Sequence, residues 1–550
     1  NEVQQATGKK FAVVTDTNGS ADEWIYDLIT WRSISDVETS LHISNVVSLP
    51  AFETDIYSGV SPHAQTLERR ALALWKLAGD DADTVFLPIR SLIAKTVSPG
   101  EMRKLGATIK RDDEFPPDEL IRLLEATGYV REDPILNVGQ FSIRGGILDV
   151  WSPDAAMPIR IEFFGDTVDS IREFDPETQL STGQIKSTSI APMREFAATT
   201  DDLKEWAFFA EERFASELFT RSLKDRTDFA AEGESFAGWE FLLPLIKPLT
   251  GSAFDYLKGF VFVIDEPTIV ESTAAKFIDD ATAHFASLGS AGEIGLHPEE
   301  LLLSAEELNG RFDLPPRIEL RALGKTAAQT DADFALSENT ESVPIFLFPT
   351  AAHSVDLELT SRPTRKFHGD IADFAASIRS LKSSNDTLIV LNTSGMAERI
   401  GDILRDYSIP AESVAIIIGN MAGGFEMPQV GLSVYSEFDI FGEEHRPEGA
   451  KPGKPKIGGG RKSRLGAFIS DFRDLKPGDY VVHVDHGIGR FDGLQTISTQ
   501  GLEREFMLLV YADDSKLFVP VERLDLVSRY SSGDATSPTL DRLGGIGWQK

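Results

Sequence analysis

Apolar and polar residues alternate along residues 140–175, which carry the clearest strand pattern in the chain. The segment 159–164 (IRIEFF) divides into two faces: Ile159, Ile161 and Phe163 point to one side, and Arg160, Glu162 and Phe164 point to the other. Two strands are expected before it, at 140–144 and 147–151, and the glycine pair at 145–146 allows the bend between them. The pattern predicts a small β-sheet with one aliphatic face.

The face opposite this aliphatic stripe carries Arg160 and Phe164. Protein interfaces favour these two residue types, because an arginine and an aromatic ring give large, specific contacts when they are desolvated. The structural alternative is that Phe164 packs under a covering loop and that Arg160 is only solvated. From the alternation alone, this alternative is favoured.

Short apolar segments alternate with helical patterns in the first part of the chain. Strands are predicted at 11–15 and 85–89, and helices at 22–31 and 62–77. This βαβ order predicts a parallel sheet. Helices and strands return after residue 196, and a long helix is expected at 202–220. A chain of 550 residues exceeds what one hydrophobic core supports, so several domains are expected.

A parallel sheet can carry a phosphate-binding loop, Gly-x-x-x-x-Gly-Lys-Ser/Thr, whose amides cradle phosphates and whose hydroxyl holds magnesium. The sequence contains none. The segment 8–10 lacks the hydroxyl residue, and 458–463 has an arginine before its lysine in place of glycine. The segment 319–326 ends in Gly-Lys-Thr, but Glu319 stands at the first glycine position and no strand is expected before it.

The segment 260–266 (FVFVIDE) looks like a Walker B strand, which ends in acids that position magnesium and water. Such acids act only opposite a phosphate-binding loop. Without one, Asp265 and Glu266 are predicted to cap a helix that begins at Pro267. We therefore expect a vestigial site with no bound cofactor.

Composition narrows the function classes. The formal net charge of −33 argues against a surface dedicated to coating nucleic acid, and the absence of cysteine excludes disulfides and thiolate chemistry. No apolar run is long enough to span a bilayer and no leader opens the chain, so a soluble, cytoplasmic protein is expected. One basic segment, 446–464, carries seven cations against one glutamate, and we interpret it as a flexible linker that contacts DNA weakly at most.

Two further modules follow residue 366. Residues 367–443 predict an α/β unit, with strands at 387–391, 414–418 and 431–435 and a helix at 395–407. Residues 476–530 predict a small barrel of short strands with a hairpin turn at 512–515. His483 and His486 lie three residues apart, which is a weak metal signal without a third ligand, and we expect no metal.

Two segments have sequences that are distinctive of a known protein family. The phrase RGGILDVWSP…PIRIEFFGDTVDSIREFDPETQ resembles the UvrB-homology module of bacterial transcription-repair coupling factors, and HVDHGIGRF with YADDSKLFVPVERL resembles their CarD-like RNA polymerase-interacting domain. The resemblance implies that the first module binds UvrA through Arg144, Arg160 and Phe164. It implies that the second module pairs an edge strand with the polymerase β subunit at Leu494, Thr496, Ile497 and Ser498. By alternation, Ile497 lies on the face opposite Leu494 and Thr496, unless it instead faces the barrel core.

The resemblance also implies the fold class: multidomain α/β, with a degenerate helicase-like (P-loop-type) lobe, an inserted small α+β UvrA-binding domain, a further α/β domain and a C-terminal Tudor/SH3-like small β-barrel. The expected divisions are 1–112 and 197–350 for the lobe, 113–196 for the inserted domain, 366–443 for the α/β domain, 444–470 for the linker, 471–535 for the barrel and 536–550 for the start of a linker to a motor. In that family, ATP and magnesium belong to this motor, which we expect to lie outside the chain.

The predicted function is a monomeric, non-catalytic adaptor that binds stalled RNA polymerase and recruits UvrA for nucleotide excision repair. One alternative is an ATP-dependent helicase of the UvrB type, which intact motor motifs would support. The other is a CarD-like regulator that acts only on polymerase and leaves the face of residues 140–175 unused.

Overall fold

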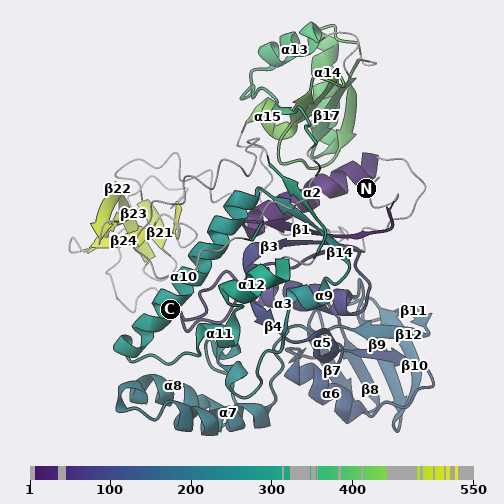
Figure 1. Ribbon diagram of the computed structural model, residues 1–550. Helices are drawn as coiled ribbons and strands as arrows, with labels where there is room; N and C mark the ends of the chain where they lie inside the picture. The colour runs from purple at the N-terminus through teal and green to yellow at the C-terminus, as the bar shows by residue number, and fades with distance from the viewer. Residues whose placement is uncertain are drawn as a thin grey trace. The chain divides into compact units, whose positions relative to one another are not determined.

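The computed structural model forms two compact units, Asn1–Ile440 and Phe441–Lys550, each described by itself (Figure 1). The structure describes residues 7–34, 45–312, 315–321, 347–348, 355, 357–381, 386–410, 413–442, 480–483, 487–499, 502–512, 516–520 and 527–529. The basic segment 446–464, the Gly-Lys-Thr of 324–326, the segment 458–463, His486 and residues 536–550 lie outside these ranges.

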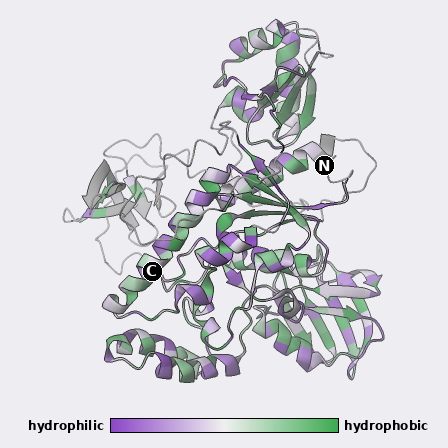
Figure 2. Cartoon of the chain, in the orientation of Figure 1, coloured by the Kyte–Doolittle hydropathy of each residue, from purple (hydrophilic) through white to green (hydrophobic). Residues whose placement is uncertain are grey.

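A five-stranded parallel sheet forms the centre of the N-terminal unit. Its strand order is β15-β14-β1-β3-β2, and every neighbouring pair is parallel. The strands are β1 (Lys10–Thr15), β2 (Val46–Ser48), β3 (Thr84–Pro88), β14 (Phe260–Asp265) and β15 (Arg317–Leu320). Figure 2 shows these strands as predominantly hydrophobic, as expected for a sheet covered on both faces. The predicted parallel α/β arrangement is confirmed.

Helices connect and cover these strands. The helices before residue 107 are α2 (Asn18–Ile34), α3 (Ala64–Ala78), α4 (Ile89–Ile93) and α5 (Pro99–Met102). Those after residue 196 are α7 (Thr200–Arg213), α8 (Thr220–Ala231), α9 (Ala253–Tyr256), α10 (Pro267–Ala291), α11 (Pro298–Leu301) and α12 (Ala305–Phe312), with the 3-10 turns η2 (Glu217–Phe219), η3 (Trp239–Phe241) and η4 (Leu243–Leu245). A short antiparallel pair, β4 (Lys95–Thr96) with β13 (Gly251–Ser252), joins the two sets.

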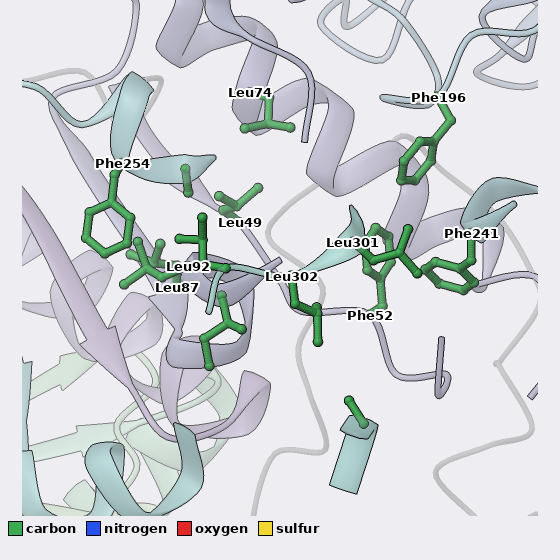
Figure 3. Close-up of a cluster of buried hydrophobic side chains, with 14 of the residues drawn as sticks. Leu49, Phe52, Leu74, Leu87, Leu92, Phe196, Phe241, Phe254, Leu301 and Leu302 are labelled. Atoms are coloured by element: carbon green, nitrogen blue, oxygen red, sulfur yellow. The ribbon is translucent and has the colours of Figure 1, made fainter. Parts of the chain in front are cut away.

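One hydrophobic core holds the two sets together. Leu49, Phe52 and Leu74 come from the first set, whereas Phe241 and Leu302 come from the second, and all lie in one buried cluster (Figure 3). Residues 107–196 therefore interrupt a single core in sequence without dividing it in space.

A buried ion pair stands where the chain returns to this core. The Arg70 guanidinium donates from Nε and Nη2 to the Glu195 carboxylate at 2.7 and 3.0 Å. Both side chains are almost fully buried, and Thr96 donates a further hydrogen bond to Glu195. The pair fixes helix α3 to the end of the segment 107–196.

The inserted segment contains its own sheet. The strands β6 (Val130–Arg131), β7 (Gln140–Arg144), β8 (Ile147–Val150), β9 (Ile159–Phe164), β10 (Thr167–Phe174) and β11 (Ser181–Ile185) pair in the order β11-β10-β9-β8-β7-β6. Helix α6 (Pro117–Ala126) packs on one face, and β5 (Ala107–Lys110) pairs antiparallel with β12 (Ser187–Ile190).

The last part of the N-terminal unit is a second mixed sheet. The strands β16 (Arg362–Pro363), β17 (Asp386–Leu391), β18 (Ala415–Ile418), β19 (Phe425–Met427) and β20 (Leu432–Ser436) pair in the order β16-β19-β20-β17-β18, with helices α13 (Ile371–Ser380), α14 (Ser394–Asp406) and α15 (Glu437–Phe441). The strands and the helix predicted between 387 and 435 are confirmed to within a few residues.

Helix α2 contacts this second sheet's loop 419–422. Thr30 donates to the carbonyl of Asn420 at 2.6 Å, and the Asp27 carboxylate accepts from the amide of Ala422 at 3.0 Å. Burial raises the pKa of Asp27 to about 6, chiefly because the charged form loses solvation.

We expect Asp27→Asn to make the protein more stable above pH 6. A carboxyl group with a pKa raised by folding stabilises the fold most below its unfolded pKa, and this contribution is lost as the pH rises through about 6. The asparagine oxygen still accepts from Ala422 but carries no charge. The free energy of unfolding of the variant, relative to wild type, should therefore rise by on the order of 2 kcal/mol from pH 4 to pH 7.5. Thermal unfolding across this range measures the gain. An equal gain from exposed Asp228→Asn would contradict it.

The C-terminal unit is a five-stranded antiparallel sheet within its described residues. The strands β21 (Tyr480–His483), β22 (Gly487–Thr499), β23 (Leu502–Val510), β24 (Lys516–Pro520) and β25 (Val527–Arg529) pair in the order β24-β23-β22-β21-β25. Val481, Phe491 and Leu509 belong to its small core. β23 and β24 pair with each other as the predicted hairpin requires, and residues 513–515 of its expected turn lie outside the described residues.

Two local predictions are wrong, and the predicted helix cap before Pro267 is confirmed only in part. The helix expected over 202–220 ends at Arg213, because Phe214 leaves the helical conformation and buries its ring in the core. Glu266 is the N-cap residue of α10, which begins at Pro267 as predicted, and its carbonyl accepts from the amides of Ile269 and Val270, but its side chain makes no capping hydrogen bond to the helix. Strand β15 does precede Gly324 in the sequence, contrary to the prediction. It contains Glu319, whose carboxylate accepts a hydrogen bond from Arg317 at 2.8 Å.

Candidate functional site

The sheet of residues 130–185 has one buried face. Ile159 and Ile161 of β9 are buried, and they pack with Leu148 of β8 and with Leu120 and Leu124 of helix α6. Strict alternation along β9 therefore turns Arg160, Glu162 and Phe164 to the other face, as the sequence predicts.

The strand register places all three predicted UvrA-binding residues on this other face. Arg144 lies opposite Ile147 across β7 and β8, and Ile147 lies opposite Glu162 across β8 and β9. Directly opposed residues share a face of an antiparallel pair, and Phe164 lies two residues beyond Glu162. Arg144, Arg160 and Phe164 thus share one surface, which we call the outer face.

Phe164 stands at the end of the β9–β10 hairpin. It pairs with Thr167 across a turn in which Gly165 adopts φ +64°. Its side chain is 84% exposed, so no described loop covers it. The ring is therefore accessible to a partner.

Arg160 is held by other side chains. Its Nε and Nη2 donate to the two carboxylate oxygens of Asp149 at 2.7 and 2.8 Å, and its guanidinium lies 4.6 Å from the centre of the Phe174 ring. The hydrogen bond to Asp149 is the main cause that raises the pKa of Arg160. Only 19% of the side chain is exposed. The alternative in which Arg160 is solvated and Phe164 is covered is therefore wrong on both residues.

Arg144 is the more accessible cation of the outer face, with 52% of its side chain exposed. Its Nη2 lies 3.3 Å from Asp133 and 3.4 Å from the same Asp149 carboxylate that binds Arg160. Glu162, in contrast, is engaged by Arg172 and accepts from Ser170 at 2.8 Å. The outer face therefore offers Phe164 and Arg144 to a partner more freely than Arg160.

Asp149 is the residue of this site that the sequence interpretation misses. It is 1% exposed and lies directly opposite Arg160 across β8 and β9. One signal could have found it: an aspartate in the apolar strand ILDV needs a cationic partner, and the neighbouring strand supplies one in register.

The predicted polymerase-binding residues lie in β22. Leu494, Thr496, Ile497 and Ser498 pair with Met507, Glu505, Arg504 and Glu503 of β23. On its other side, β22 pairs with β21 only over residues 487–490, so no described strand pairs with the far edge of residues 494–499. The side chains of these four residues and of His483 lie outside the described residues, so the orientation of Ile497 stays a prediction.

Comparison with known proteins identifies both modules. Residues 107–196 match the UvrB interaction domain, and residues 475–531 match the CarD-like/TRCF RID domain. The transcription-repair-coupling factor of Myxococcus xanthus is 31% identical over 531 residues, covering 93% of this chain and 43% of that protein. The chain is a relative of the transcription-repair-coupling factors. The predicted resemblance is confirmed.

Other relatives agree with this assignment. The transcription-repair-coupling factor of Haemophilus influenzae is 28% identical over 94% of this chain, and that of Escherichia coli is 25% identical over 92%. The chain spans only 44% and 42% of these two proteins, less than half of each curated relative. The activities and partners of whole coupling factors are therefore proposals for this chain.

The segment that resembles a Walker B strand has a structural use in this relative of the coupling factors. The Asp265 carboxylate accepts from the indole Nε1 of Trp24 at 2.8 Å, and burial raises its pKa. Within the described part of the chain, no three metal-binding side chains gather in one place. The helices of that same part are too short or too polar to cross a bilayer.

Proposed function

We propose that this chain is an adaptor of transcription-coupled DNA repair. Its UvrB-interaction domain binds UvrA through Arg144, Arg160 and Phe164, and its CarD-like domain binds the β subunit of RNA polymerase through the edge of β22 at residues 494–498. The observation that carries the proposal is the 84% exposed Phe164, which shares one face of a matched UvrB interaction domain with two arginines. The remaining parts, including the α/β sheet of β17, serve as scaffold.

The proposal includes a helicase-like lobe without a nucleotide site. The segments 8–10, 319–326 and 458–463 lack the residues of a phosphate-binding loop, and the Asp265 carboxylate accepts a hydrogen bond from Trp24. We therefore expect the purified chain to show no ATP turnover above a heat-treated control. Turnover that rises with chain concentration would favour the helicase alternative instead. The chain is further proposed to act as a monomer and to meet DNA weakly through residues 446–464.

The affinity of the chain for purified UvrA tests the proposal. We expect Phe164→Ala to weaken binding about 30-fold or more, because an exposed aromatic anchor of an interface contributes roughly 2 kcal/mol or more when buried by a partner. The unfolding temperature should not change, since the ring makes no buried contact in the free chain.

The matched control is Phe208→Ala, which removes a ring that is 66% exposed on helix α7. Titration calorimetry should give wild-type affinity for this control. If wild type does not bind UvrA at all, the coupling role fails for this chain. If Phe208→Ala and Phe164→Ala weaken binding equally, the contact lies elsewhere.

A further inference from the structure

The outer face contains a carboxylate that cannot reach a partner. Asp149 is buried, with 2% of its side chain exposed, although it lies between two arginines proposed to bind UvrA. Both of its oxygens accept from Arg160, and Oδ2 also lies 3.4 Å from Nη2 of Arg144. A buried carboxylate is stable only with such partners, so the three side chains form one unit.

We propose that Asp149 is the positioning residue of the UvrA-binding face. Its carboxylate fixes the plane of the Arg160 guanidinium and draws Arg144 to the same oxygen, so that two cations are preset on the face that carries Phe164. The inference rests on the proposed function and deepens it, because it assigns separate roles to the residues of one surface.

Charge explains why this surface needs an internal anion. The guanidinium groups of Arg144 and Arg160 both contact Oδ2 of Asp149, so their positive charges lie close together and repel each other. The negative charge of Asp149 offsets that repulsion. Arg160 is also restrained by the Phe174 ring, which lies 4.6 Å from the guanidinium. Restraint before binding lowers the entropy lost on association, which increases affinity without any new contact.

The hydrogen-bond count shows what remains for a partner. A guanidinium has five N–H donors, of which Arg160 gives two to Asp149 and directs a third towards the carbonyl of Gln179 at 3.5 Å. Arg144 is half exposed, and its contact with half-exposed Asp133 is the kind of surface pair that costs little to break. The complementary surface therefore presents a carboxylate for Arg144, placed next to an apolar pocket for Phe164.

The test compares two aspartates that contact the same arginine. We expect Asp149→Asn to weaken UvrA binding about tenfold, the loss that corresponds to freeing one restrained side chain. Asp133→Asn makes the same chemical change at an exposed position and should not weaken binding. Titration calorimetry with the full chain and purified UvrA measures both. Equal affinities for wild type and a folded Asp149→Asn variant would overturn the inference while leaving the proposed function intact.

A double-mutant cycle separates positioning from a merely structural role. In the Arg160→Ala background, the effect of Asp149→Asn should shrink to the part that its 3.4 Å contact with Arg144 contributes, whereas in the Phe164→Ala background its tenfold effect should persist. Full additivity with Arg160→Ala would overturn the inference. If Asp149→Asn does not fold, Arg160→Lys replaces it, because lysine keeps the charge but cannot pair through two parallel hydrogen bonds. Wild-type affinity of this lysine variant would also overturn it.

Discussion

Glu195→Ala is expected to destabilise the N-terminal unit by about 3–5 kcal/mol, because it leaves the Arg70 guanidinium buried without its counter-ion. Glu195 is fully buried and receives hydrogen bonds from Arg70 and Thr96. Arg70 retains only the carbonyl of Pro50, at 2.7 Å, and the ring of Phe52 in the variant. Since the pair closes the return from residues 107–196, its loss should loosen that segment from the core.

Calorimetric unfolding of the full chain measures this effect as a transition lowered on the order of 10 °C. The control is Arg69→Ala on the adjacent residue, which breaks a pair with Asp22 at 2.7 Å in which both side chains are 29% exposed. This control should cost about 1 kcal/mol or less. The double variant Arg70→Met, Glu195→Met should recover most of the lost stability, because no charge then remains buried. Equal destabilisation by Arg69→Ala and Glu195→Ala would refute the argument.

Local pattern was sufficient for much of the fold. The alternation in 159–164 placed Ile159 and Ile161 in the core and Phe164 on the opposite face, because a strand has only two faces. The parallel sheet followed from apolar segments separated by helices, such as 11–15 and 85–89, which pair as β1 and β3. These features depend on residues that are close together in the sequence.

Features that depend on distant partners could not be predicted in this way. Arg70 and Glu195 lie 125 residues apart, and nothing in the sequence around either residue indicates that they pair. The end of helix α7 is set by the burial of Phe214 rather than by a capping residue, so helical periodicity continued past it.

The candidate site shows the same division. Alternation gave the outer face, and the family resemblance gave its three residues, but neither showed that Arg160 is largely occupied by Asp149. An arginine on a solvent-facing strand position is compatible with solvation, with a partner contact or with an ion pair to the next strand. Only the register between β8 and β9 distinguishes them. This is why Phe164→Ala tests binding more cleanly than a change at Arg160, which would leave the buried Asp149 with only its 3.4 Å contact to Arg144.

A proline at one of two adjacent positions of β22 should weaken polymerase binding without unfolding the sheet. In an antiparallel pair, successive residues direct their N–H groups alternately towards the partner strand and away from it. Thr496 and Ile497 are successive residues, opposite Glu505 and Arg504 of β23. One of the two N–H groups therefore belongs to the β22–β23 ladder, and the other faces the edge with no described strand partner.

Thr496→Pro and Ile497→Pro should behave differently for this reason. The proline in the ladder removes an internal hydrogen bond and destabilises the sheet by about 3 kcal/mol or more. The other proline leaves the ladder intact but removes an outward donor and obstructs an added strand, so binding to the polymerase β subunit should fall at least about tenfold. Alanine at the same positions keeps every backbone donor and should have the smaller effect. Wild-type binding by the stably folded proline variant would exclude this edge as the polymerase contact.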